Sequence, residues 1–372
     1  MKLRYKISAG FFGLIAIAII ALAIALSYTA PCDDSPGGAA AAASGETMQA
    51  VRYSCYGGPE VLAVETVAKP VPEGNEVLVR VQSAAVNPLD WHYMRGSPYF
   101  MRLGSGIGAP ADPRVGVDYA GIVEAVGPEV SKFAPGDRVF GGRNGAFAEY
   151  VVVPADRGIT AIAPEVSFEE AAAVPIAALT ALQAVRDKGQ VQAGDKVLIN
   201  GASGGVGTYA VQIAKAFGAE VHGVCSTRNV EMVRSLGADR VWDYKLEDYT
   251  QGSEQYDVIV DMVGNHSIGA NLGVMKDDGV LVRVGGPKGD WFAPLKGPIG
   301  ALLKSPFVSQ ELIVFVARIT QEDLSAIADL MADGKVRSVI DRRFRLGQVA
   351  EAIRYSETGR ARGKIIIQVD VD

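Results

Sequence analysis

The residues best suited to chemistry are the glycines of one short turn. Gly201, Gly204, Gly205 and Gly207 follow the apolar run Val197 to Ile199, and a helical pattern of apolar residues follows them. Glycine has no Cβ, so the backbone of such a turn can approach a phosphate closely, and the N–H groups that open the next helix then face the anion. A strand, a glycine turn and a helix in this order are typical of a dinucleotide-binding site.

The turn departs from the usual G-x-G-x-x-G pattern, because Ala202 stands at the first glycine position. A second apolar run, Val221 to Cys225, begins after Gly218 and Ala219, so the segment has the length of a βαβ unit. The sequence therefore predicts that the turn binds the pyrophosphate of a nicotinamide cofactor. The residues predicted to do so are Ala202, Ser203, Gly204, Gly205, Val206 and Gly207.

The end of the second strand predicts which cofactor is bound. An Asp or Glu about 20 residues beyond the glycine turn would bind the 2′-hydroxyl of NAD, whereas the 2′-phosphate of NADP needs donors and positive charge. Here the strand is followed by Ser226, Thr227 and Arg228, with no carboxylate. This favours NADPH, and the alternative that Ser226 serves only as a helix N-cap stays open.

The stretch from Gly194 to Lys215 resembles the signature of the quinone oxidoreductase and zeta-crystallin branch of the medium-chain dehydrogenase/reductases. The likeness covers roughly residues 48–369 and implies an α/β protein: a GroES-like, β-rich catalytic domain with a doubly wound parallel (Rossmann) dinucleotide-binding domain. Besides Ala202 to Gly207, Gln212 and Lys215, it rests on Asn87 to Asp90, Gly116 to Gly121, Pro135 to Phe140, Gly145 to Tyr150 and Ala361 to Lys364.

The resemblance also implies site residues. Asn87 and Asp90 would lie beside the nicotinamide, and an Asn-Pro turn capped by Asp is the structural alternative. Tyr99 stands close to where some enoyl-thioester reductases of this superfamily keep a proton-donating tyrosine, and a phenol can protonate an enolate. The further residues expected to contact the cofactor are Thr180, Tyr244, Val263, Gly264, Gly285, Gly286, Gly363 and Lys364.

Zinc is not expected in this chain. Zinc-dependent members of the superfamily carry a Cys near position 87 and Gly-His-Glu near 116–118, whereas this chain has Asn87 and then Gly116-Val117-Asp118. The cysteines, Cys32, Cys55 and Cys225, are too few for the four-cysteine zinc lobe of those members. Each is expected to be a thiol, and one bridge is the alternative if the body is exported.

These observations predict an NADPH-dependent oxidoreductase that transfers hydride to a quinone or an α,β-unsaturated carbonyl without zinc. Reduction of a simple carbonyl needs a Lewis acid or a strong proton relay, whereas conjugate reduction needs neither. The charge then develops on an oxygen that water, a backbone N–H or a phenol can serve. The alternatives that stay open are an NAD(P)-dependent alcohol or aldehyde dehydrogenase and a non-catalytic, membrane-tethered NADPH-binding protein.

The composition is that of a globular protein, with 49% apolar and 21% charged residues in 372. The net charge of −6, without a basic cluster beyond the extreme N-terminus, argues against nucleic acid as a partner. A small carbonyl or quinone substrate is the expected partner, and a homodimer is a further expectation.

The N-terminal segment is uncharged from Ile7 to Ala30. As a helix with a rise of about 1.5 Å per residue, it would span the ~30 Å hydrocarbon core of a bilayer. The sequence therefore predicts a transmembrane helix over 7–30 and a single-pass protein of the cell membrane. The side that the body faces stays open, and a cleaved signal peptide is the alternative.

The predicted organisation has six parts. A basic N-terminus (1–6) precedes the membrane helix (7–30) and a flexible linker (31–47) rich in Gly, Ala, Ser and Pro. A catalytic domain (48–175), a Rossmann domain that binds NADPH (176–320) and a return to the catalytic domain (321–372) follow.

Overall fold

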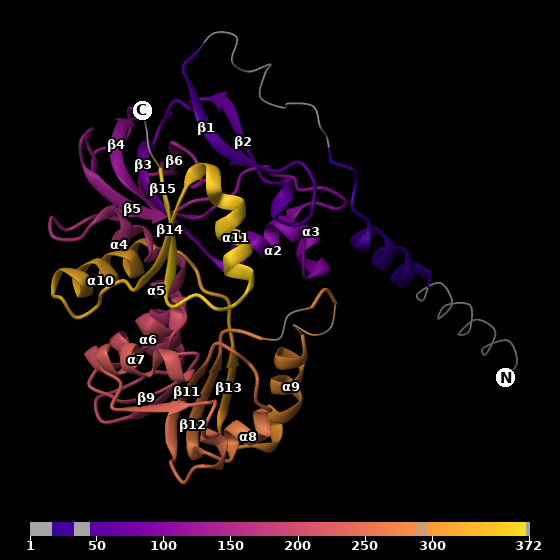
Figure 1. The fold of residues 1–372 in the computed structure, drawn as a ribbon, viewed down its shortest axis with the longest axis vertical. Helices are drawn as coiled ribbons and strands as arrows, with labels where there is room; N and C mark the ends of the chain where they lie inside the picture. The colour runs from indigo at the N-terminus through magenta and orange to yellow at the C-terminus, as the bar shows by residue number, and fades with distance from the viewer. Residues whose placement is uncertain (1–16, 33–44, 287–288, 292, 294, 370–372) are drawn as a thin grey trace, which may run out of the picture.

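The computed structural model describes residues 17–32, 45–286, 289–291, 293 and 295–369. Most of these residues form two lobes, of which the upper in Figure 1 is rich in β-strands and the lower holds a parallel sheet. The chain builds most of the upper lobe first, then the lower, and returns to the upper lobe at its end.

The upper lobe is organised around the long strand β3 (Glu76–Val86), which pairs antiparallel with three neighbours: β4, β6 and β15. Its seven-stranded sheet has the order β14-β15-β3-β4-β5-β7, and β6 also pairs with β3. The other strands are β4 (Asp118–Val126), β5 (Arg138–Gly142), β6 (Tyr150–Pro154), β7 (Ile159–Ala161), β14 (Ile340–Arg345) and β15 (Lys364–Gln368), with β1 (Thr47–Arg52) and β2 (Ala63–Ala68) forming a separate pair.

Short helices surround this sheet. Its core is an apolar cluster that includes Val79 and Val81 of β3 and Ile365 and Ile367 of β15, so the closing strand is part of the same core. The helices are α2 (Pro88–Arg95), α3 (Arg102–Ser105), α4 (Phe168–Ala172) and α11 (Val349–Glu357).

The lower lobe is a doubly wound parallel sheet with the strand order β10-β9-β8-β11-β12-β13. Its central strand β8 carries Val197, Leu198 and Ile199, all fully buried, as expected where helices cover both faces. The strands are β8 (Lys196–Asn200), β9 (Glu220–Cys225), β10 (Arg240–Asp243), β11 (Tyr256–Asp261), β12 (Met275–Arg283) and β13 (Glu311–Val314), and the helices are α5 (Pro175–Leu182), α6 (Gly205–Ala216), α7 (Val230–Ser235), α8 (Ile268–Leu272) and α9 (Lys296–Lys304). Helix α10 (Gln321–Ala332) lies beside α4 in Figure 1 and packs against β7 of the upper sheet and against α5.

The predicted fold class, a GroES-like β-rich unit with a Rossmann unit, is confirmed, because the strand order reverses at β8 as it does in dinucleotide-binding sheets. The domain boundaries given above stay predictions. The last strand of the parallel sheet, β13, is short (Glu311–Val314), and a 3-10 turn that contains Pro306 (Ser305–Phe307) precedes it.

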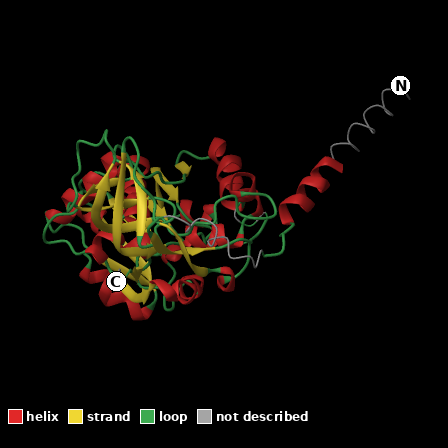
Figure 2. Cartoon of the chain, turned by 90° about the horizontal axis from the view of Figure 1, so that it is seen from above, coloured by secondary structure: helices red, strands yellow, loops and turns green. Residues whose placement is uncertain are grey.

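The N-terminal segment corrects the sequence prediction. Residues 17–27 form a helix that lies outside both lobes in Figure 2, and residues 7–16 lie outside the described part of the chain. Among the described residues, no helix is both long enough and apolar enough to cross a membrane. The prediction of a transmembrane helix, and with it of a single-pass protein bound to the lipid bilayer of the cell membrane, is therefore wrong for the chain as described.

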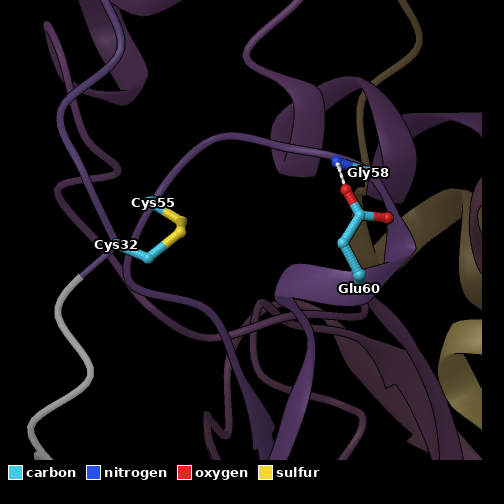
Figure 3. Close-up of a disulfide and its surroundings, with 4 residues drawn as sticks. All are labelled: Cys32, Cys55, Gly58 and Glu60. Carbon is cyan, nitrogen blue, oxygen red and sulfur yellow. Dashed lines mark hydrogen bonds between the residues drawn. A yellow bond between two sulfur atoms is a disulfide. The ribbon is translucent and has the colours of Figure 1, made fainter.

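The segment that follows this helix is attached to the body. Ala30 N donates to Gly108 O at 2.8 Å, and Cys32 and Cys55 form a disulfide (Figure 3). The expectation that these two cysteines are thiols is wrong, whereas Cys225 is free and buried. The predicted linker over 31–47 falls largely on residues 33–44, outside the described residues, but its first part, at Cys32, is fixed to the upper lobe.

Candidate active site

The glycine turn lies between the end of β8 and the start of α6. Gly201 has φ of 92°, in the left-handed region that glycine reaches at little cost. A Cβ on Gly207 would collide with the carbonyl oxygen of Gly201 and would lie 2.8 Å from Ala202 Cα, whereas a Cβ on Gly204 would meet nothing closer than 3.4 Å. Gly207 is therefore required by the packing of the turn against the helix, and Gly204 leaves its backbone open on the side away from the protein.

Polar side chains connect this turn to the end of β9. Asn229, 5% exposed, donates from Nδ2 to Ser203 Oγ at 3.0 Å and to Ser226 Oγ at 3.3 Å. Ser226 is the N-cap residue of the 3-10 turn Thr227–Asn229, but its side chain makes no capping bond. Sequence reasoning missed Asn229, and its position three residues after Ser226 was the only signal for it.

A buried cluster of polar residues lies at the junction of the two lobes. Lys364 Nζ donates to Asn87 Oδ1 at 2.6 Å and to Asp118 Oδ2 at 3.2 Å, and Asn87 Nδ2 donates to Asp118 Oδ2 at 2.9 Å. The three residues are 3%, 2% and 0% exposed. The N–H of Ile176, in the first turn of α5, donates to Asp118 Oδ1 at 3.0 Å. We call Asn87, Asp118 and Lys364 the amide–ammonium cluster.

This cluster is next to the glycine turn. Gly363 N donates to Ser203 O at 3.0 Å, and a Cβ on Gly205 would lie 3.3 Å from Cδ of Lys364. The start of β15 thus joins the upper lobe to the start of α6, where unpaired N–H groups favour an anion. Asp118 was not among the predicted site residues. Its signal in the sequence was its place in the Gly116–Gly121 landmark.

Asp90 extends the cluster toward a cavity. Asn87 N donates to Asp90 Oδ2 at 2.7 Å, so the Asn-Pro turn capped by Asp is present. Asp90 Oδ1 is buried and has no hydrogen-bond partner among the described residues. Burial raises the pKa of Asp90 to about 7, with the nearby Asp118 carboxylate adding to the shift, while the Asn87 N–H and Lys364 oppose it. Burial also raises the pKa of Asp118, against the ammonium of Lys364.

The donor atoms of the cluster do not suit zinc. The two oxygens that face the junction, Asn87 Oδ1 and Asp118 Oδ2, already accept hydrogen bonds from an ammonium. In the part of the chain that the structure describes, no group of three or more His, Cys, Asp or Glu residues is placed to hold a metal ion. We therefore derive no step through a metal.

A cavity of about 270 Å³ opens beside Asp90. The aromatic rings of Tyr53 and Tyr93 and the apolar Leu89 line it, and the Arg114–Asp112 ion pair, with an N–O distance of 2.7 Å, lies at its wall. Its mixed lining is typical of a site for a small organic molecule with one or two polar groups. The other lining residues are Gly104, Ser105, Ala111, Val115, Gly116, Val117 and Asn144.

Tyr99 lies at a different contact between the lobes. Its N–H donates to Asp290 O at 2.8 Å, and its ring meets Trp291 edge-on with the ring centres 5.0 Å apart. Both partners follow β12 of the Rossmann lobe. The structure thus brings Asn87 and Asp90 together and places Tyr99 on a loop that touches the other lobe.

The remaining predicted cofactor residues gather near the carboxyl ends of the parallel strands. Asp261 Oδ1, at the end of β11, accepts from the N–H groups of Val263 and Gly264 at 3.1 and 2.9 Å, and Gly285 N donates to Asp261 O at 3.3 Å. Tyr244 N donates to Cys225 O at 3.1 Å, at the end of β9. Ligands of open α/β sheets bind at this edge. Thr180, on α5, instead donates to Ile176 O at 2.6 Å.

Known protein families match the sequence of each lobe. The model of the alcohol dehydrogenase GroES-like domain matches residues 73–164, and that of the zinc-binding dehydrogenase family matches residues 236–367. A chloroplast envelope quinone oxidoreductase homolog of Arabidopsis thaliana is 34% identical over 345 residues, covering 87% of this chain and 99% of that protein.

Other matches point the same way. The 2-methylene-furan-3-one reductase of Solanum lycopersicum is 33% identical over 336 residues, covering 86% of this chain and 79% of that protein. The structure of the quinone oxidoreductase from Coxiella burnetii superposes with a TM-score of 0.76 at 29% identity, covering 87% of this chain and all of that one.

A β-rich lobe, a Rossmann lobe and a glycine turn at their junction define an NAD(P)H-dependent oxidoreductase. The chain belongs to the quinone oxidoreductase family of the medium-chain dehydrogenase/reductases.

Proposed function

We propose that the protein reduces a quinone or an α,β-unsaturated carbonyl with hydride from NADPH, without zinc. The observation that carries the proposal is the amide–ammonium cluster beside the glycine turn. A zinc site there would need free ligand atoms, but the oxygens of Asn87 and Asp118 bind the buried ammonium of Lys364. The names of the relatives, quinone oxidoreductase homologs and a 2-methylene-furan-3-one reductase, support the same substrate classes.

The chain's own residues would bind and orient the reactants. The turn Ala202–Gly207 and the N–H groups of α6 suit the pyrophosphate. NADPH, when bound, supplies the hydride. The cavity beside Asp90 suits a flat, conjugated substrate, because two tyrosine rings and apolar side chains line it.

We propose that Tyr99 delivers the proton to the substrate oxygen, a role that rests on the family resemblance and on its place where the lobes meet. Asn87 would orient the nicotinamide through its amide, whose position is fixed by Lys364 and Asp118. The homodimer expected from the sequence stays a prediction.

NADPH rather than NADH is supported by the residues at the end of β9. Arg228 is exposed and donates to the backbone oxygen of Arg360 at 2.7 Å, so one guanidinium lies just beyond the end of β9, where the 2′ position of the ribose is normally read. The nearest carboxylate, Asp243 at the end of β10, is engaged with the Thr227 side chain, which lowers the pKa of Asp243, and with Lys245 N at 3.0 Å.

The reaction is tested with the purified full chain, NADPH and a panel of a quinone, an enone and an aldehyde, alongside NADP⁺ with a primary alcohol. We expect turnover of the quinone or enone to exceed turnover of the alcohol and to be unchanged by a chelator. Chelator-sensitive alcohol oxidation, with neither quinone nor enone turned over, would contradict the proposal and favour an alcohol dehydrogenase.

The cofactor preference is tested by Arg228→Glu. Loss of a charge-assisted hydrogen bond is expected to weaken NADPH binding about 10- to 100-fold and NADH binding far less. Arg234→Glu on α7, whose partner is the exposed Glu231 at 2.7 Å, makes the same charge change as a control and should leave the preference intact. Equal affinity of the wild type for NADH and NADPH, measured by fluorescence titration, would show the assignment to be wrong.

A further inference from the structure

Arg102 joins the N-terminal segment to the upper lobe. It is 2% exposed, and its guanidinium donates from Nε to Gly96 O at 2.7 Å within the lobe. From Nη1 it donates to Leu26 O at 3.0 Å, to Tyr28 O at 2.7 Å and to Thr29 Oγ1 at 3.3 Å. A buried charge needs such partners, so the segment 26–29 supplies part of what keeps Arg102 in place.

Each cysteine of the disulfide is close in sequence to residues that contact Arg102. Cys32 continues the segment that Arg102 binds, and Tyr56, next to Cys55, lies under the Arg102 guanidinium with its ring centre at 4.4 Å. The hydroxyl of Tyr56 donates to Gly106 O at 2.7 Å, just after α3. Both cysteines are therefore connected to Arg102 through short stretches of chain.

Arg102 also contacts the side of the candidate active site. Its guanidinium lies 4.7 Å from the centre of the Tyr99 ring, which meets Trp291 of the other lobe. Ser105, one turn after Arg102 on α3, lines the cavity beside Asp90. A movement of Arg102 would therefore displace both the Tyr99 loop and one wall of the cavity.

We propose that residues 26–32 contribute to substrate binding and that Arg102 is the positioning residue through which they act. Reduction of the Cys32–Cys55 disulfide by a dithiol then weakens this contribution to substrate binding. The proposal rests on the proposed function only for the identity of the substrate. The family resemblance begins near Met48, so it assigns nothing to this segment.

The chemical step is thiol–disulfide exchange with a dithiol. The S–S bond of Cys32 and Cys55 breaks and two thiols form, while the dithiol loses two electrons and two protons and becomes a disulfide. The segment is then held by its hydrogen bonds and by the buried side chain of Leu26, since the covalent restraint on it is gone. When the segment leaves, Arg102 loses its Leu26, Tyr28 and Thr29 acceptors and must move or take up water.

The test compares the oxidised full chain with the same protein after dithiol treatment. Thiol titration of the denatured protein should find one thiol before treatment and three after. Reduction is expected to raise the KM for a simple quinone about 3- to 10-fold, because substrate positioning is lost, and to leave the NADPH dissociation constant within about 2-fold. Reduction that yields three thiols without a change in KM would overturn the proposal.

Variants separate the disulfide from other effects of the dithiol. Cys32→Ser/Cys55→Ser should resemble the reduced wild type and no longer respond, while Cys225→Ala, which removes the thiol outside the disulfide, should keep the response. Arg102→Lys, which keeps the charge, should raise the KM less than Arg102→Met. An equal dithiol effect in the double serine variant would contradict the proposal.

Failure of the proposed function can be distinguished from failure of the proposed role of residues 26–32. If neither oxidised nor reduced protein reduces a quinone or enone, the substrate assignment fails, and limited proteolysis then tests the attachment alone. We expect faster cleavage within residues 26–32 and 96–106 after reduction. Equal cleavage rates in the two states would overturn the role of the disulfide.

Discussion

The glycine turn and the amide–ammonium cluster lie side by side at the junction of the lobes, but they are built in opposite ways. The turn consists of consecutive residues, and its shape follows from the left-handed Gly201 and from the close approach at Gly207. The cluster unites residues 31 and 246 positions apart, held by buried hydrogen bonds and charge. One half of the site therefore depends on local sterics, and the other on long-range electrostatics.

This difference predicts different responses to mutation. A turn whose shape depends on close packing is destabilised when an atom is added. A buried cluster of charged groups is destabilised when one partner is removed. The cluster also lies where the two lobes are joined, because Lys364 belongs to β15 and the preceding Gly363 N donates to Ser203 O of the glycine turn at 3.0 Å.

Lys364→Met should have the largest effect. It leaves the Asp118 carboxylate buried without its ammonium, so we expect a loss of about 3–5 kcal/mol in the free energy of unfolding. Adding Asp118→Asn should recover part of this loss, which a double-mutant cycle in urea measures. The control is Lys335→Met, which breaks the exposed pair with Asp333 and should cost less than about 1 kcal/mol. Similar losses of unfolding free energy for the two lysine substitutions would show that the buried cluster is no more important for stability than an exposed ion pair.

Gly207→Ala should come next. Its methyl group would meet the backbone of Gly201 and Ala202, so we expect a cost near the upper end of the usual range for overpacking, about 3 kcal/mol in thermal or urea unfolding. Gly204→Ala is the matched control, with φ of −83° and room for a Cβ, and should cost less than about 1 kcal/mol. Gly204→Ala should instead weaken NADPH binding. Equal destabilisation by both substitutions would show that the turn is not sterically determined.

The pH dependence of stability should give the smallest effect. Because burial raises the pKa of Asp90 to about 7, the folded protein keeps its proton at a pH where the unfolded chain has lost it. The contribution of Asp90 to stability therefore falls as pH rises toward 7, by about 1 kcal/mol between pH 6 and pH 7. Asp90→Asn should remove this contribution, as measured by the difference in slope between the wild type and the variant in urea unfolding at each pH.

Asp112 provides the control for that measurement. Its hydrogen bonds with Arg114 lower the pKa of Asp112, so its contribution to stability is lost only at lower pH. Asp112→Asn should therefore leave the slope between pH 6 and pH 7 unchanged. Equal slopes between pH 6 and pH 7 in the wild type and in Asp90→Asn would contradict the raised pKa of Asp90.

The sequence was informative wherever the signal was local. The order of strands and helices, the glycine turn and the family landmarks predicted the fold class and the family. The same reasoning was wrong for the N-terminal segment, because the described helix ends at Ser27 and the chain then pairs with the upper lobe at Ala30, so the apolar run is not one long helix in the part that the structure describes. It was also wrong for Cys32 and Cys55, since their spacing contains no sign of a bond.

By itself, the sequence determined the conformations that depend on a few neighbouring residues: the turn at Gly201, the capped Asn87-Pro88 helix start and the buried parallel strands. Only the tertiary structure decided which distant groups meet. Lys364 binds Asn87 and Asp118, Arg102 binds the segment 26–29, and Asp90 lies buried at a cavity. The physical reason is that hydrogen bonds, charges and pKa values depend on burial and on partners brought together by packing, and no local pattern of residues encodes those contacts.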